Sequence, residues 1–265
     1  MAASGTLFLL PFLAGLAGAA ALPLVGIMLR LRAEWLAALS LTQWAAAGVL
    51  LANALGLPAW LGALGGAAGA AAVKGLAGTR GNTWHAAAWL AGWALYMLIA
   101  ANTAGGQALI DGQLYFAGGP ELVLLLAMAA LTAISAPWLV ERLLRDRLFP
   151  ALETANGRRR WPWRLLFEAL AAATLAMAAA TLGLMATFAL AVLPAWVAFA
   201  VAPSLRAAYG MALGLSIGGF ITAFWIALRW DQPFGPVLVL VLVALAAAGA
   251  LPLRQWWRPS GAARD

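Results

Sequence analysis

The sequence predicts an all-α protein that crosses a membrane several times. Of its 265 residues, 65% are hydrophobic and 9% are charged, whereas soluble domains are close to half apolar and a quarter charged. The long apolar stretches are rich in Ala, Leu and Gly and do not alternate between apolar and polar residues, as membrane strands do. A single soluble domain, a disordered chain and a membrane β-barrel are therefore excluded.

Nine apolar segments are long enough to cross a hydrocarbon core, which takes about 20 helical residues. We expect them at about 6–29, 35–55, 58–78, 84–104, 120–140, 165–183, 184–203, 207–228 and 234–253. The run 165–203 is divided at Gly183, and eight spans are the alternative if one of this pair only half-crosses. The first segment lacks the basic start of a secretory signal, so we expect it to stay as a helix. Residues 1–265 are expected to form a single transmembrane domain.

The basic residues predict the orientation of the helices, because cytoplasmic loops carry the excess of Lys and Arg. With the N-terminus outside, 15 of the 16 basic residues fall on the inner side, and only Arg229 falls outside. We therefore expect an outer N-terminus, a cytoplasmic C-terminus and a location in the cell's inner (plasma) membrane. The net charge of +7 then reflects topology and contact with membrane lipid, and indicates no nucleic-acid partner.

Two loops are long enough to have a role. The outer loop 105–119 is punctuated by glycines and predicts a short helix or a re-entrant element. The inner loop 141–164, "ERLLRDRLFPALETANGRRRWPWR", is the only strongly polar stretch. Pro150 suits a first helical turn and Gly157 suits a C-cap, so 150–156 predicts a short helix. Such a helix would suit a soluble docking partner, and the alternative is an Arg-rich loop that only fixes topology.

The residue types present exclude several kinds of chemistry. The chain has no cysteine and a single histidine, His85, so disulfides, thiolate metal sites and multi-histidine sites are excluded. It has no phosphate-binding loop for ATP, and its spans hold no paired carboxylates for acid–base catalysis. We expect no enzyme activity, no resident metal and no cofactor in this chain.

A few polar side chains fall inside or near the ends of the predicted spans. Lys74 and Glu168 lie within reach of the inner surface, and Glu168 is expected to pair with Arg164, four residues earlier. His85 is expected to be structural. Four methionines within spans are expected to fill gaps in the core, the alternative being a soft-ligand path for Cu(I); they are Met97, Met128, Met177 and Met185.

The C-terminal third resembles the membrane permeases of the ABC transporters that import zinc, manganese or iron. "GLMATFALAVLPAWVAF" (183–199) precedes a basic turn, a Gly-rich helix and "LRWDQPFGPVLVLV" (228–241), with matching motifs at Pro194-Ala195 and Gly235-Pro236. Three further segments are similar to that family, so the resemblance runs from about 10 to 253. They are "GIMLRLRAEWLAALSLTQWAAAGVLLA" (26–52), "LYFAGGPELVLLL" (114–126) and "LFPALETANG" (148–157).

The resemblance implies a permease subunit of an importer that works by alternating access. Its implied partners are a second permease copy, a cytoplasmic ABC ATPase that binds ATP and Mg²⁺, and an extracytoplasmic substrate-binding protein. In that family a short helix in the inner loop docks on the ATPase. By this resemblance the coupling residues are Phe149, Pro150, Leu152, Glu153 and Gly157.

The second helix departs from the family. Metal-importing members carry an Asp there and a His four residues later, and the corresponding positions are Ala37 and Leu41. Ser40, Thr42 and Gln43 remain as candidates for the translocation pathway, although hydroxyls and amides also satisfy neighbouring helices. The expected cargo is a divalent metal (zinc, manganese or iron) or a metal chelate. The alternatives are a permease for a non-metal cargo and a non-transporting membrane scaffold with the permease fold.

Overall fold

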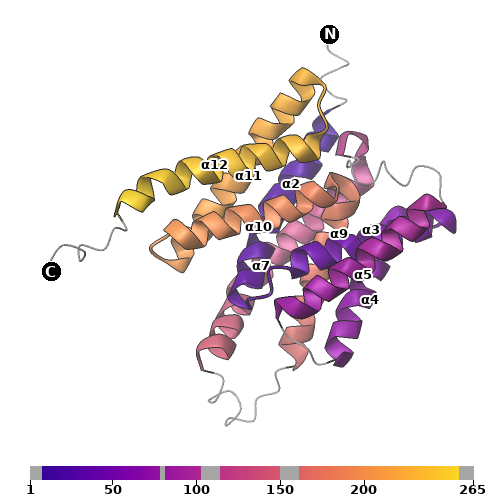
Figure 1. The fold of residues 1–265 in the computed structure, drawn as a ribbon, viewed down its shortest axis with the longest axis horizontal. Coiled ribbons are helices and arrows are strands. Elements are labelled where there is room, and N and C mark those ends of the chain that lie inside the picture. The colour runs from indigo at the N-terminus through magenta and orange to yellow at the C-terminus, as the bar shows by residue number, and fades with distance from the viewer. Residues whose placement is uncertain (1–7, 78–80, 103–113, 150–160, 257–265) are drawn as a thin grey trace, which may run out of the picture.

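The predicted all-α architecture is confirmed by a computed structural model, which describes residues 8–77, 81–102, 114–149 and 161–256 (Figure 1). These residues form nine α-helices and one 3-10 turn. The elements are α2 (Leu9–Leu31), α3 (Ala37–Ala54), α4 (Ala59–Ala77), α5 (Asn82–Ala101), η1 (Leu114–Phe116), α7 (Gly119–Leu148), α9 (Trp161–Leu182), α10 (Leu184–Val201), α11 (Leu205–Trp230) and α12 (Phe234–Trp256).

Each of the nine predicted segments coincides with one of these helices. The uncertain division of 165–203 is confirmed at Gly183, whose φ of 90° separates α9 from α10. Within the described residues, seven helices are long and apolar enough to cross a membrane, namely α2, α3, α5, α7, α9, α10 and α11. The apolar stretch of α12, Phe234–Ala248, is shorter than in these seven helices.

The first helix, α2, lies at the centre of the bundle. It packs against α7, α9, α10 and α11 (Figure 1). Leu22, Ile27 and Met28 on this helix are fully buried. Gly26 allows α10 to approach closely, because a methyl group there would overlap the carbonyl of Ala191. The first helix is therefore part of the core of the fold.

Helices α3 and α4 form the most closely packed pair. The backbone of Gly62 lies against the carbonyl of Gly48, and Gly66 lies against the carbonyl of Trp44, so neither position has room for a side chain. Small residues allow such an approach where lipid provides no hydrophobic drive between helices. Helices α3 and α4 are therefore packed together as one unit.

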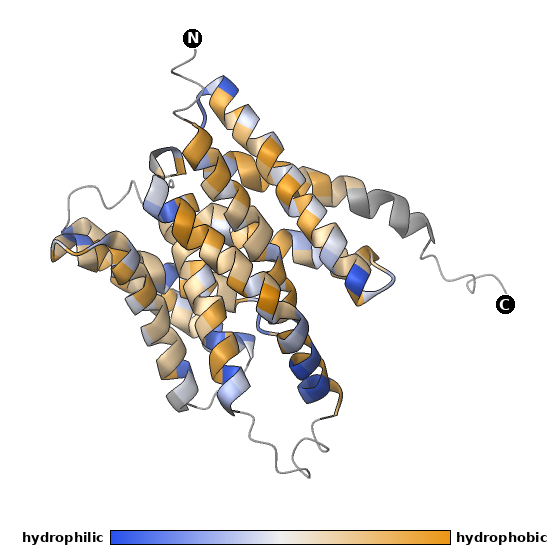
Figure 2. Cartoon of the chain, turned by 180° about the vertical axis from the view of Figure 1, so that it is seen from behind, coloured by the Kyte–Doolittle hydropathy of each residue, from blue (hydrophilic) through white to orange (hydrophobic). Residues whose placement is uncertain are grey.

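The predicted boundary at residue 140 is wrong, because α7 continues to Leu148 and α9 begins at Trp161. The predicted inner loop 141–164 therefore starts as helix. The buried face of α7 continues beyond the apolar segment at Val140 and Leu143. Glu141 pairs with Arg145, one turn later on the same helix. Figure 2 shows the hydrophilic residues gathered at this lower end of α7.

Charged side chains collect at one end of the bundle, which we call the basic end. It holds the turn 32–36, Lys74 and the last turns of α7. Ion pairs join the turn to Lys74 and α9, and α7 to α9. At the opposite end, the turn η1 packs against the start of α2, and Phe220 contacts the rings of Phe224 and Phe234 at 5.8 and 5.6 Å. This turn is the described part of the predicted outer loop.

Candidate functional site

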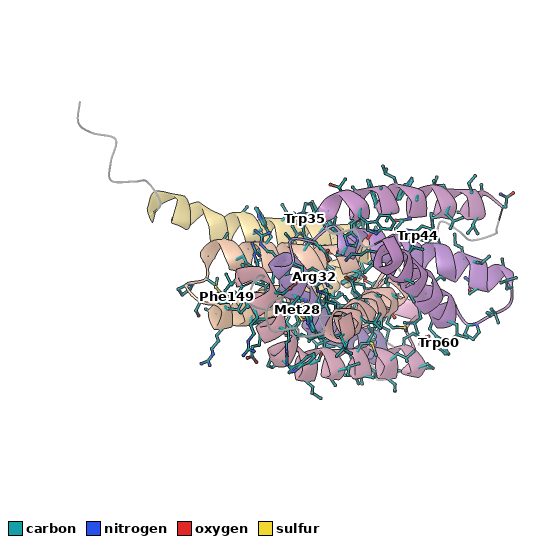
Figure 3. The ribbon with its side chains drawn as sticks, turned by 90° about the horizontal axis from the view of Figure 1, so that it is seen from below. Met28, Arg32, Trp35, Trp44, Trp60 and Phe149 are labelled. Carbon is teal, nitrogen blue, oxygen red and sulfur yellow. The ribbon has the colours of Figure 1, made fainter. Side chains whose placement is uncertain are left out.

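The predicted coupling segment begins at the basic end, directly after the last residue of α7. Phe149 caps this helix (Figure 3). It is 55% exposed, and Leu148 before it is 63% exposed. The other predicted coupling residues lie outside the described residues; they are Pro150, Leu152, Glu153 and Gly157.

The end of α7 is fixed to two other helices. Arg147 Nη1 donates to the carbonyl of Leu31 at 2.9 Å and to that of Arg30 at 3.4 Å. These are among the last carbonyls of α2, which lack partners inside their own helix. Arg164 of α9 donates to both carboxylate oxygens of Asp146, at 2.8 and 2.6 Å. The end of α7, just before Phe149, is therefore joined to α2 and α9.

The predicted pairing of Glu168 with Arg164 is wrong. Arg164 is engaged by Asp146, whose two carboxylate oxygens both accept from Nη2 of the guanidinium group. Glu168 instead accepts Lys74 Nζ at 2.7 Å and contacts Arg32 Nη2 at 3.0 Å. Lys74 does not extend to the surface either, since it is only 4% exposed.

These contacts close an ionic ring of four residues, Arg32, Glu34, Lys74 and Glu168. On the other side of the ring, Glu34 Oε2 contacts Arg32 Nε at 2.9 Å and Lys74 Nζ at 2.8 Å. One oxygen of each carboxylate thus contacts both cations. Arg32 also lies over the ring of Phe167, with 4.9 Å to its centroid. The ring joins the turn 32–36 to α4 and α9, and Figure 3 shows Arg32 in the middle of this end.

Glu34 stays ionised although it is buried. Burial raises the pKa of its carboxyl, but Arg32, Lys74 and a hydrogen bond from the Gly81 amide at 3.3 Å together bring that pKa below its ordinary value of 4.5. The two cations and two carboxylates balance, so the ring carries no net charge.

The three predicted pathway residues lie inside the helix bundle. Ser40, Thr42 and Gln43 are 1%, 1% and 2% exposed. Thr42 Oγ1 donates within its own helix, to the carbonyls of Ala38 and Leu39 at 2.8 and 3.0 Å. Ser40 and Gln43 instead contact α5.

A polar seam runs between α3 and α5. The Leu36 amide donates to Asn82 Oδ1 at 3.0 Å, and Ser40 Oγ lies 2.8 Å from His85 Nδ1. One turn further, Trp44 Nε1 donates to the carbonyl of Ala88 at 2.8 Å. His85 is therefore buried in the interface between α3 and α5, a position that agrees with the structural role expected for it.

Two atoms of this seam are buried without a hydrogen-bond partner among the described residues, His85 Nε2 and Gln43 Nε2. The positions that correspond to the family's Asp and His are buried as well, with Ala37 at 1% and Leu41 at 2% exposure. No group of three or more His, Asp or Glu residues in the described part of the chain is placed to hold a metal ion. The expected core packing of the four methionines is confirmed for Met177, which is buried, and for Met128, which packs against the core, and is wrong for Met97 and Met185, which are exposed.

Glu34 and its role in the ring were missed by the sequence reasoning. The available signal was that three charged residues, Glu34, Lys74 and Glu168, each interrupt or border an apolar segment. Intramembrane charges usually pair with one another. The contacting members of the ring are up to 136 residues apart, between Arg32 and Glu168, so spacing along one helix did not reveal them.

Comparisons with known proteins agree with this fold. The solved structure described as PsaBC from Streptococcus pneumoniae in complex with Fab has a TM-score of 0.77 and 17% identity, over 90% of this chain and 89% of that one. A second, described as an inward-facing conformation of a putative metal-chelate type ABC transporter, has a TM-score of 0.72 and 16% identity, over 91% and 85%. At these identities the similarity concerns the fold. No curated protein matches the sequence.

The family follows from the sequence itself. Residues 6–251 match the model of the ABC 3 transport family, which is nearly the whole chain and confirms the resemblance. Permease subunits of this family are non-catalytic transmembrane subunits that carry no cofactor, and a separate subunit hydrolyses ATP. The chain belongs to the ABC 3 transport family and is a multi-pass membrane permease subunit of an ABC importer.

Proposed function

We propose that this permease imports a divalent metal or a metal chelate as one of two permease copies, bound to a cytoplasmic ATPase and served by an outer substrate-binding protein. The family match over residues 6–251 carries the proposal. The similarity of the fold to a structure described as a putative metal-chelate type ABC transporter supports the class of cargo.

The side chains of α3 favour a chelate over a bare dication. Ala37 and Leu41 place buried apolar groups where metal-importing relatives carry ligands. The polar candidates beside them, Ser40, Thr42 and Gln43, are uncharged. An uncharged surface does not repay the dehydration of a divalent ion, whereas a chelator carries the ligands with the metal. Because all three residues are buried, transport through them requires α3 to separate from a neighbouring helix.

The segment 149–157 is proposed to bind the ATPase. Phe149 is the exposed first residue of this segment. Arg147 and Arg164 join the helix end before it to α2 and α9. A displacement of the segment would thus act on three helices together.

Coupling is tested by co-purifying the chain with a candidate ABC ATPase from the same genome and measuring ATP hydrolysis. Glu153→Arg and Phe149→Ala should weaken the complex or its ATPase activity. Arg145→Met, on the exposed face of α7 just before the segment, serves as the control. Normal complex formation and hydrolysis after disruption of 149–157 would overturn the coupling assignment.

The pathway and cargo are tested by ATP-driven uptake into vesicles that hold the complex with its binding protein. Candidates are Zn²⁺, Mn²⁺, Fe²⁺ and chelated iron. Ser40→Ala and Gln43→Leu should reduce uptake, whereas the control Ser135→Ala should not, because Ser135 is only half-buried and its hydroxyl bonds to carbonyls of its own helix. Uptake of only a non-metal cargo would overturn the cargo class, and no uptake of any candidate would favour the scaffold alternative.

A further inference from the structure

The ionic ring joins three elements that are distant in the sequence. Arg32 and Glu34 come from the turn between α2 and α3, Lys74 from α4 and Glu168 from α9. Apart from Trp60, Lys74 is the only residue of α4 whose side chain carries a polar atom. The polar attachment of α4 to the turn and to α9 therefore depends on one ammonium group.

Stability alone does not account for such a ring. A buried set of ion pairs is often replaced by apolar residues without loss of stability, and its best-attested use is to specify one arrangement or to switch between two. The ring is also incompletely satisfied, because Arg32 Nη1 is buried without a hydrogen-bond partner among the residues described. A free donor of this kind suits a group that changes partners.

The turn that carries half of the ring is strained. Ala33 has a φ of 57°, in the left-handed region that side chains disfavour, and it lies between Arg32 and Glu34. Both neighbours of the strained residue are thus held by the ring. Since α4 is packed on α3 through Gly62 and Gly66, a change at this turn would move α3 and α4 together.

We propose that the ionic ring is a latch that holds the turn 32–36 and α4 against α9 in one state of the transporter and opens in another. This proposal rests on the proposed transport cycle. When the latch opens, Ala33 is released from its strained conformation and the α3–α4 pair pivots away from α9. The shift falls within the range of hinge and helix movements that connect transporter states.

The test measures the distance between α4 and α9 with spin labels. The chain has no cysteine, so Val73→Cys on α4 and Leu165→Cys on α9, at positions 53% and 60% exposed, label one site each. A second pair, Leu51→Cys on α3 and Leu61→Cys on α4, reports on the glycine-packed pair. Distances are first measured on the full chain in lipid nanodiscs.

The ring is removed without a charge imbalance by Lys74→Met with Glu168→Gln, and independently by Arg32→Met with Glu34→Gln. The matched control is Arg145→Met with Glu141→Gln, which removes an exposed ion pair on α7. Both ring variants should broaden the 73–165 distribution or add a second distance. The control should leave it narrow, and the 51–61 distance should stay constant in every variant that is folded.

The native ring is then followed in the complex with the ATPase. The mean 73–165 distance should shift between the nucleotide-free and the Mg-ATP states, while the 51–61 distance does not. A 73–165 distribution that stays the same in the ring variants and in both nucleotide states would overturn the latch. A chain that neither binds nor stimulates an ATPase would instead overturn the proposed function, and the nanodisc comparison would still decide on the latch.

Discussion

Lys74 of α4 and Glu168 of α9 form an ion pair of 2.7 Å across 94 residues of sequence. The same ammonium contacts Glu34 at 2.8 Å, and Arg32 completes the ring. Because both cations touch both carboxylates, the loss of any one member leaves an unbalanced charge in a buried place. The four side chains therefore act as one unit.

Removal of Lys74 alone should be costly. Lys74→Met leaves two carboxylates with only Arg32, and an uncompensated buried charge typically costs about 3–5 kcal/mol. The double variant Lys74→Met/Glu168→Gln is balanced and should recover most of this loss. Thermal unfolding in detergent measures both. Equal melting temperatures for the wild type and the single variant would show that the ring contributes nothing to stability.

Acid should weaken the structure through Glu34. Its pKa is lower in the folded protein than its ordinary value of 4.5. The carboxylate therefore contributes fully to the free energy of unfolding above that value, and the contribution is lost as the pH falls through the folded pKa. Melting curves recorded from neutral pH downwards should show a loss of stability in acid. The Glu34→Gln variant should be less stable than the wild type at neutral pH, and its melting temperature should fall less as the pH is lowered. Curves of melting temperature against pH that run parallel for the two proteins would contradict this assignment.

Glycine should relieve the strain at position 33. The left-handed conformation of Ala33 costs an L-residue about 1–2 kcal/mol, while glycine loses about 0.5–1 kcal/mol more backbone entropy on folding. Ala33→Gly should thus stabilise the protein by up to about 1.5 kcal/mol. Ala33→Val should destabilise it, because a branched side chain tolerates this conformation least. The order Gly, Ala, Val in melting temperature is the expected result, and the reverse order would refute it.

The contact of α3 with α4 gives a matched pair of glycine substitutions. Gly62→Ala places a methyl group onto the carbonyl of Gly48, and such overpacking typically costs about 1–3 kcal/mol. Gly65 lies on the same helix with nothing within 4 Å of an added methyl group. Gly65→Ala should therefore raise stability by up to about 1 kcal/mol, through helix propensity alone. Similar melting temperatures for the two variants would rule out close packing at Gly62.

The helices were predictable because each is encoded locally. Twenty apolar residues suffice to indicate a span, and even the division at Gly183 followed from the length of the run 165–203. The end of α7 was not predicted, because hydropathy detects only the part of a helix inside the membrane. Its continuation to Leu148 depends on Leu143 packing into the bundle and on Arg147 reaching α2.

The site was less predictable, since its partners are brought together only by the packing of distant helices. Glu168 has a possible partner four residues away in Arg164, and the local rule selected it. The fold gives Arg164 to Asp146 and Glu168 to Lys74. Ser40 was selected for its polarity on α3, but its contact with His85 required knowledge that α5 lies beside that face.

The length of α7 has a mechanical consequence. Its 30 residues span about 45 Å, against a hydrocarbon core of about 30 Å. The last turns of α7 extend past its apolar segment, with Phe149 directly after them and Arg147 bonded to the carbonyl of Leu31. Force applied at Phe149 would reach α2, the innermost helix of the bundle, both through the packing of α7 on α2 and through the hydrogen bonds of Arg147.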